Sequence, residues 1–172
     1  FDIDALGWSP DGRYLAAATH DALVLWDLAT SAPGRALTAR PSELQVVAFS
    51  PDGALVAGGD DTGAIYVYEL AAGRERATLK DHHASVKALL FVDQDRIAAG
   101  DRAGDLRLHD LAAGTSRVVF QGGGVIRSIA LSPDRRLLAT ASDDRMVRLH
   151  DLATFDARTL RGHRSAVQHV AF

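Results

Sequence analysis

Short apolar runs alternate with turn sequences along the whole chain. The apolar run 46–49 (VVAF) precedes the turn sequence 50–53 (SPDG), and a second apolar run, 54–57 (ALVA), follows it. Proline at the second position and glycine at the fourth suit a type I turn, so the sequence predicts a hairpin here. No stretch of useful length places apolar residues at i, i+3, i+4 and i+7, as a helix would require. The pattern therefore predicts an all-β protein.

The hairpin pattern recurs at a nearly constant interval. An apolar residue before the turn stands at Trp8, Phe49, Phe91, Leu131 and Phe172, at intervals of 41, 42, 40 and 41 residues. A second marker keeps the same interval, as the pairs Trp26-Asp27, Tyr68-Glu69, His109-Asp110 and His150-Asp151. Two independent markers in phase indicate an internal repeat. Each repeat has room for four short strands, so we expect four-stranded antiparallel sheets.

A small antiparallel sheet cannot bury both of its faces alone, and radial stacking of such sheets in a β-propeller solves this problem. We expect blades at 1–41, 42–81, 82–121 and 122–162, and the first strand of a fifth blade at 163–172. A ring closed at four blades has no place for that strand. The sequence therefore predicts an open arc of a larger propeller, with about seven blades.

An open arc has consequences at its two ends. We expect exposed apolar faces there and an unpaired strand at the C-terminal end, which would permit association through the ends. The chain begins at Phe1 without a Met and stops after an apolar run. We therefore expect it to be part of a longer protein.

Two segments resemble a known family. The segment 161–172, with Gly162-His163, is similar to the opening of a WD repeat, and 138–152, which ends in His150-Asp151-Leu152, is similar to its middle. The chain resembles the WD-repeat β-propeller family over essentially its whole length. The resemblance implies these structural repeat markers: Trp26, Asp27, Asp110, Ser142, Asp144, Asp151 and His163.

The resemblance also implies a hydrogen-bonded set in each blade, formed by a His, a strand Ser or Thr, a turn Asp and a Trp. No blade of this chain has all four. The retained members are Thr19, Asp21 and Trp26 in the first blade, His82 in the third, and Ser142 and Asp144 in the fourth. The departures are Arg40 and Tyr68 in the second blade, Ala103 and His109 in the third, and Gly122 and His150 in the fourth. We expect apolar packing to hold the blades together, and the third blade to be the weakest.

The composition of the chain limits the kinds of ligand and site that we expect. A net charge of -3 gives no reason to expect nucleic acid, and no run approaches the roughly 20 apolar residues needed to cross a bilayer. The absence of Cys excludes disulfides and thiolate metal sites, and it fits a cytoplasmic location. His109 and His150 would lie a blade apart, whereas zinc needs three or four converging ligands. We expect no catalytic residue, no metal site and no cofactor.

The resemblance implies that loops between blades, and loops between the second and third strands, share one rim where family members commonly bind partners. Arg and His residues on such a rim suit acidic peptide segments. The expected partner-binding residues are Arg40, Glu43, Thr62, His82, His83, Arg102, Arg145 and Arg164. We expect a non-enzymatic scaffold for protein–protein interaction in a larger signalling or regulatory protein, of bacterial origin on its Ala and Arg content. The alternative is a ligand-binding or catalytic propeller whose site lies in other blades.

Overall fold

The computed structural model describes residues 2–30, 32–39 and 42–172. These residues form four separate four-stranded antiparallel sheets, in which each strand pairs with the next along the chain, and no sheet is closed. The predicted all-β propeller of four-stranded blades is confirmed. Each sheet lies within one of the four predicted blades, whose limits stay predictions.

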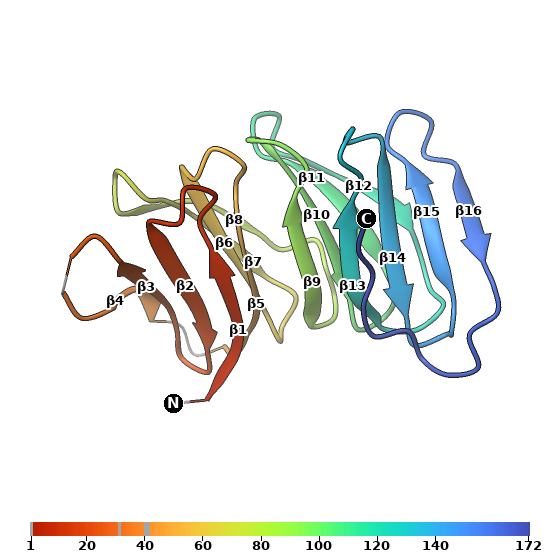
Figure 1. The fold of residues 1–172 in the computed structure, drawn as a ribbon, viewed down its shortest axis with the longest axis horizontal. Coiled ribbons are helices and arrows are strands. Elements are labelled where there is room, and N and C mark those ends of the chain that lie inside the picture. Colours follow the sequence, from red (N-terminus) through yellow and green to blue (C-terminus); the bar gives the residue numbers. More distant parts are fainter. Residues whose placement is uncertain (1, 31, 40–41) are drawn as a thin grey trace.

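The strands of the first and second sheets are β1 (Ile3–Trp8), β2 (Tyr14–Thr19), β3 (Ala22–Asp27), β4 (Arg35–Ala39), β5 (Leu44–Phe49), β6 (Leu55–Asp60), β7 (Ile65–Glu69) and β8 (Arg74–Leu79). Those of the third and fourth sheets are β9 (Val86–Phe91), β10 (Arg96–Asp101), β11 (Leu106–Asp110), β12 (Thr115–Phe120), β13 (Ile126–Leu131), β14 (Leu137–Ser142), β15 (Val147–Asp151) and β16 (Ala157–Leu160). The sheets stand in a row and form an open arc (Figure 1). Because β1 packs on β5, β5 on β9 and β9 on β13, the first strands line a common inner side.

The repeated SPDG sequence forms the turn between the first and second strands of a sheet. The Gly12 N–H donates to the Ser9 carbonyl at 2.9 Å, as a type I turn requires, and Gly12 has φ +70°. The Ser9 hydroxyl also donates to the Asp11 carboxylate at 2.6 Å. In the fourth sheet Arg135 takes the glycine position, with φ +57°. A side chain there is sterically unfavourable, because left-handed backbone suits glycine.

Apolar side chains fill the spaces between the sheets. Leu23 and Val56 are buried between the first and second sheets, and Ile65 and Ile97 between the second and third. Leu138 is buried against the third sheet. Each fully buried side chain of this size contributes roughly 1.5–3 kcal/mol, so the stacking of sheets accounts for much of the stability.

Glycines in two second strands allow close approach of the next sheet. A Cβ at Gly59 would lie 2.7 Å from Cγ1 of Val86, and a Cβ at Gly100 would lie 2.5 Å from Cγ2 of Ile126. Both distances are too short for a side chain. The first strand of the next sheet therefore packs directly against the backbone of each glycine.

The two ends of the arc expose apolar side chains, as an open arc predicts. Leu6 and Trp8 on β1 are 58% and 61% exposed, and Phe172 is 55% exposed. Residues 161–172 form no strand, but the Val167 N–H donates to the Ser142 carbonyl at 3.1 Å, and Figure 1 shows this segment beside β13 and β14. Its assignment as the first strand of a fifth blade stays a prediction, because no described residue forms a ladder with it.

Candidate functional site on the rim

One edge of the arc carries two kinds of loop, those between sheets and those between the second and third strands of each sheet. In the fourth sheet this edge lies where β14 ends, at the lower side of Figure 1. Backbone hydrogen bonds join the two kinds of loop, for example from the Arg102 N–H to the Ser85 carbonyl at 2.9 Å and from the Asp143 N–H to the Val125 carbonyl at 3.0 Å. We call this edge the rim, which comprises residues 20–21, 42–43, 61–64, 80–85, 102–105, 121–125, 143–146 and 161–165.

Glycines bring the rim loops of neighbouring sheets into contact. Gly63 has φ +97° and its Cβ would lie 2.6 Å from the His82 carbonyl oxygen. Gly104 has φ +92° and its Cβ would lie 2.7 Å from the Gly122 carbonyl oxygen. The rim therefore runs from sheet to sheet as a connected surface.

A β-bulge lies at the rim end of every first strand. The ladder between first and second strands skips one residue in each sheet, and a bulge re-aims the side chain of the skipped residue. All four skipped residues are polar. We call them the bulge residues: Asp4, Gln45, Lys87 and Arg127.

The bulge residues lie beside the first loop residue after the second strand. Arg127 donates two hydrogen bonds to the Asp143 carboxylate, at 2.8 and 2.7 Å. This contact lowers the pKa of Asp143 and raises that of Arg127. The Lys87 ammonium instead donates to the amide oxygen of Gln45 in the second sheet. The bulge residues were missed from sequence, although each follows the first apolar residue of its strand in phase with the repeat.

Most of the predicted partner-binding residues lie on the rim and face solvent. Thr62, His83, Arg102, Arg145 and Arg164 are exposed. Glu43 is half-buried, with its carboxylate 3.9 Å from the His20 ring. Arg40 lies outside the described residues. Partner binding by these residues stays a prediction.

His82 differs from the other members of the predicted set, because it is buried. Its Nδ1 donates to the Asp101 carboxylate at 2.8 Å, and the side chains of both residues are almost fully buried. Asp101 also accepts the N–H groups of Ala103 and Asp105, at 2.9 Å each. Burial opposes ionisation of Asp101, but the hydrogen bonds outweigh it and the pKa of Asp101 is lowered. His82 therefore has a structural role in this conformation.

The third blade has a carboxylate at its rim end, although its sequence lacks one at the turn position. The turn position holds Ala103, so a carboxylate was expected to be missing there. Asp101, two residues earlier at the end of β10, supplies one instead. Asp60 does the same in the second sheet, where it is buried and accepts from the Thr62 N–H and the Tyr66 hydroxyl.

The Trp position of the third and fourth repeats holds a buried His. Burial, with His82 nearby, lowers the pKa of His109 to about 4, and burial beside Arg148 lowers that of His150 to about 4. The rings of His82 and His109 lie 5.5 Å apart, and His150 is hydrogen-bonded to Thr140 at 3.3 Å. The described residues contain no group of three or more His, Cys, Asp or Glu arranged to hold a metal ion.

Polar markers in the fourth sheet form a different network. Asp144 accepts from Arg148 at 2.6 Å, and the Arg148 guanidinium lies 4.5 Å from the Phe120 ring centre. The Ser142 hydroxyl donates to the Gly124 carbonyl at 3.1 Å. In the first sheet the Thr19 hydroxyl donates to Asp21 at 3.2 Å, and no described hydrogen bond includes the indole N–H of Trp26.

The remaining markers divide into turn caps and one rim residue. Asp27, Asp110 and Asp151 each accept a backbone N–H from the turn that follows the third strand, as at Asp151 and Ala153 (2.8 Å). His163 is exposed and lines a shallow depression of about 170 Å³ beside Arg145. The caps stabilise the fold, and His163 belongs to the rim.

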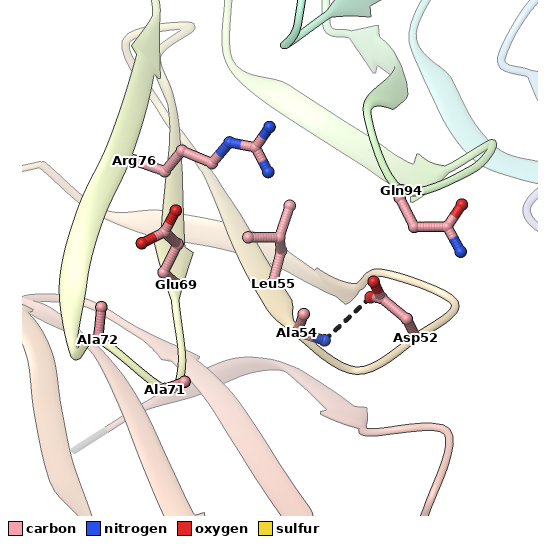
Figure 2. A pocket seen from close by; sticks show the side chains of 8 residues that line it. All are labelled: Asp52, Ala54, Leu55, Glu69, Ala71, Ala72, Arg76 and Gln94. Carbon is pink, nitrogen blue, oxygen red and sulfur yellow. Dashed lines mark hydrogen bonds between the residues drawn. The ribbon is translucent and has the colours of Figure 1, made fainter.

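A groove of about 250 Å³ lies at the opposite edge, between the second and third sheets (Figure 2). Its charged groups already have partners within the protein. Arg76 pairs with Asp95 at 2.7 Å, Glu69 with Arg74 at 3.0 Å, and Asp52 accepts the Ala54 N–H at 3.0 Å. The groove therefore offers a ligand less unpaired charge than the rim does.

The fold and rim define a β-propeller arc of repeated four-stranded blades. A family model described as WD domain, G-beta repeat matches residues 1–27 and 114–151. The WD40 repeat protein poxJ of Penicillium oxalicum is 36% identical over 92 residues, which is 52% of this chain and 27% of that protein. The same protein from strain 114-2 / CGMCC 5302 of that species matches equally. The matched segment thus covers about a quarter of the length of these curated relatives.

Solved structures show the same fold. A chain in the crystal structure of the mitotic checkpoint complex superposes with a TM-score of 0.88, over 96% of this chain and 54% of that chain, at 22% identity. The repeat markers, the four-stranded blades and these matches show a β-propeller fold that is similar to that of WD-repeat proteins. No helix in the described part of the chain is long and apolar enough to cross a membrane.

Proposed function

We propose that the chain is a non-enzymatic scaffold whose rim binds a protein partner. The observation that carries this proposal is the set of exposed rim side chains without partners. His83, Arg102, Arg145 and Arg164 make no side-chain hydrogen bond or ion pair with any described residue. Elsewhere on the surface some charged groups are paired, for example Arg13 with Asp27 at 2.9 Å. Unpaired Arg side chains suit hydrogen bonding to carboxylates of another molecule.

The rim backbone is held in place, which favours recognition by a preformed surface. Hydrogen bonds fix the loops of neighbouring strands, and Arg145 adopts φ +70°, a conformation that non-glycine residues adopt only where the surroundings enforce it. Loops positioned by a rigid scaffold commonly carry binding residues. The structural neighbour also comes from a complex. We further propose a cytoplasmic, regulatory or signalling role in a bacterial protein.

Charge reversal on the rim tests this function. In the complete reading frame, Arg102→Glu with Arg145→Glu is expected to reduce recovery of the bound partner about tenfold, measured by affinity purification and quantitative mass spectrometry. Arg136→Glu with Arg158→Glu is the control, since both residues are exposed on the same protein away from the rim. Circular dichroism checks that both variants fold. Equal recovery of every bound protein by the two variants would contradict the proposal.

A further inference from the structure

We propose that Lys87 and Arg102 form an anion-binding position on the rim above the third sheet, and that it binds a carboxylate from an acidic segment of the partner. This inference rests on the proposed function and specifies the chemistry of the partner. It is carried by a comparison of equivalent positions in the four sheets.

The geometry of the fourth sheet shows that the two positions lie within side-chain reach. Arg127 is the bulge residue of β13, Asp143 is the first residue after β14, and their side chains meet at 2.7 Å. In the third sheet the register is the same, because Val86 opposes Asp101 as Ile126 opposes Ser142. Lys87 and Arg102 therefore occupy the places of Arg127 and Asp143.

The charge at this pair of positions differs in every sheet. The fourth sheet has a cation and a carboxylate, which neutralise each other. The second has a neutral amide, Gln45, and Asp61, and the first has Asp4 and His20. The third alone among the four sheets has two cations, and no described carboxylate pairs with either of them.

The immediate surroundings leave these cations available. Arg102 is exposed, and among the described residues only its backbone N–H has a partner, the Ser85 carbonyl. Lys87 is half-buried and its one described partner is the neutral Gln45. Two like charges side by side repel each other, so a carboxylate between them removes repulsion and adds two charge-assisted hydrogen bonds.

The flanking charges favour a short acidic segment over nucleic acid. The position of Arg102 is filled by Asp61 in the second sheet and by Asp143 in the fourth. A polymer with a phosphate at every step would bring negative charge close to both carboxylates. A peptide can instead place one Asp or Glu between Lys87 and Arg102 and neutral residues at each side.

Peptide binding measures the proposed contact. The probe is a fluorescein-labelled peptide with one Glu among Gly residues, compared by fluorescence anisotropy with the counterpart that has Gln in place of Glu, on the complete protein. The Glu peptide is expected to bind about tenfold more tightly, and less tightly as salt increases. Equal affinity for the two peptides would overturn the inference, as would tighter binding of a duplex DNA competitor.

Two substitutions change the charge pattern of the third sheet toward that of the fourth, and that of the fourth toward that of the third. Arg102→Asp gives the third sheet the paired arrangement of the fourth, and is expected to weaken binding of the Glu peptide about tenfold. Asp143→Ala frees Arg127, and is expected to strengthen binding. Arg158→Asp, on the outer strand β16, changes the net charge as Arg102→Asp does and should leave affinity unchanged. Equal weakening by Arg158→Asp would show general charge attraction and overturn the inference.

Failure of this inference is distinguishable from failure of the proposed function. Partner recovery by affinity purification is measured on the same variants and on Arg145→Glu alone. If the Glu and Gln peptides bind equally but Arg145→Glu still reduces partner recovery, only the acidic-segment inference is overturned. Partner recovery that no rim substitution alters would overturn the function itself.

Discussion

The third and fourth sheets use equivalent positions for different polar contacts. In the third sheet the carboxylate of Asp101 comes from the end of the second strand and binds the buried ring of His82. In the fourth sheet the corresponding strand position holds Ser142, and the carboxylate comes from Asp144 in the turn and binds Arg148. One sheet thus buries a His–Asp pair, and the other keeps a more accessible Arg–Asp pair.

This difference shows that different residues can make the polar contact at the rim end of a sheet. A buried pair that includes a carboxylate depends on both members, since removal of one leaves the other without a partner in a poorly solvated place. The Arg148–Asp144 pair is less deeply buried, with side chains 10% and 15% exposed, and Arg148 keeps its contact with the Phe120 ring when Asp144 is lost. The two sheets should therefore respond unequally to equivalent substitutions.

The largest expected effect is loss of the third-sheet carboxylate. Asp101→Ala removes the partner of His82 and the acceptor of two backbone N–H groups, so it should reduce the free energy of unfolding by about 3–5 kcal/mol. Asp144→Ala, the matched change in the fourth sheet, should cost about 1–2 kcal/mol. Urea denaturation at pH 7 measures both. Equal losses would remove the distinction between the sheets.

Acid should destabilise both sheets through their buried histidines. His109 and His150 have a pKa of about 4 in the folded state, below the ordinary value of 6.5. Between these values the unfolded chain binds a proton at each site and the folded chain does not. Stability should therefore fall as pH decreases from 6.5 to 4, by up to about 3 kcal/mol per histidine, and should level off for these groups below pH 4.

The double substitution His109→Phe with His150→Phe tests the origin of this pH dependence. It removes both titrating groups while retaining a buried ring, so the free energy of unfolding should vary much less between pH 6.5 and 4. Thermal and urea unfolding across that range measure it. An unchanged slope would mean that other groups cause the acid sensitivity.

A change in the spacing between the third and fourth sheets should have a smaller effect on the free energy of unfolding. Gly100→Ala would place a methyl group 2.5 Å from Ile126, and should cost about 1–3 kcal/mol by overpacking. Ile126→Ala removes Cγ2, the nearest atom, so the double variant should lose less stability than the sum of the two single losses. A neutral Gly100→Ala variant, measured by urea unfolding, would show that the sheets separate without cost.

The smallest expected effect concerns the turn of the fourth sheet. Arg135 has φ +57°, where the first and second sheets have Gly12 and Gly53 at φ +70°. Arg135→Gly should stabilise the protein by about 0.5–1 kcal/mol, because relief of strain exceeds the added entropy of the unfolded chain. The reverse change, Gly53→Arg, should destabilise it. Unfolding midpoints for the two variants should shift in opposite directions.

The repeat made the fold predictable from sequence. The SPDG turns and the in-phase Trp-Asp positions indicated four-stranded sheets, and the structure forms them at the expected interval. An apolar side at both ends of the arc followed from the same pattern. These features depend on turn chemistry and burial, which local sequence records directly.

The site was only partly predictable. Asp101 was overlooked because the turn position of the third repeat holds Ala103. A carboxylate at the end of the second strand can occupy the same space as a carboxylate from the turn two residues later. The bulge residues depend on the register between two strands, which is set by pairing rather than by the residue itself. The weakness predicted for the third blade stays a prediction, although several of its buried polar atoms, such as Nε2 of His82, have no described partner.

The most direct test of the account compares the third and fourth sheets in one measurement, hydrogen–deuterium exchange with and without the Glu–Gly peptide. The Arg102 N–H, bonded to Ser85, and the Asp143 N–H, bonded to Val125, are equivalent reporters. Bound peptide should slow exchange in 85–87 and 101–103 and leave 125–127 and 142–144 unchanged. Equal protection of both segments, or of neither, would contradict an anion-binding position specific to the third sheet.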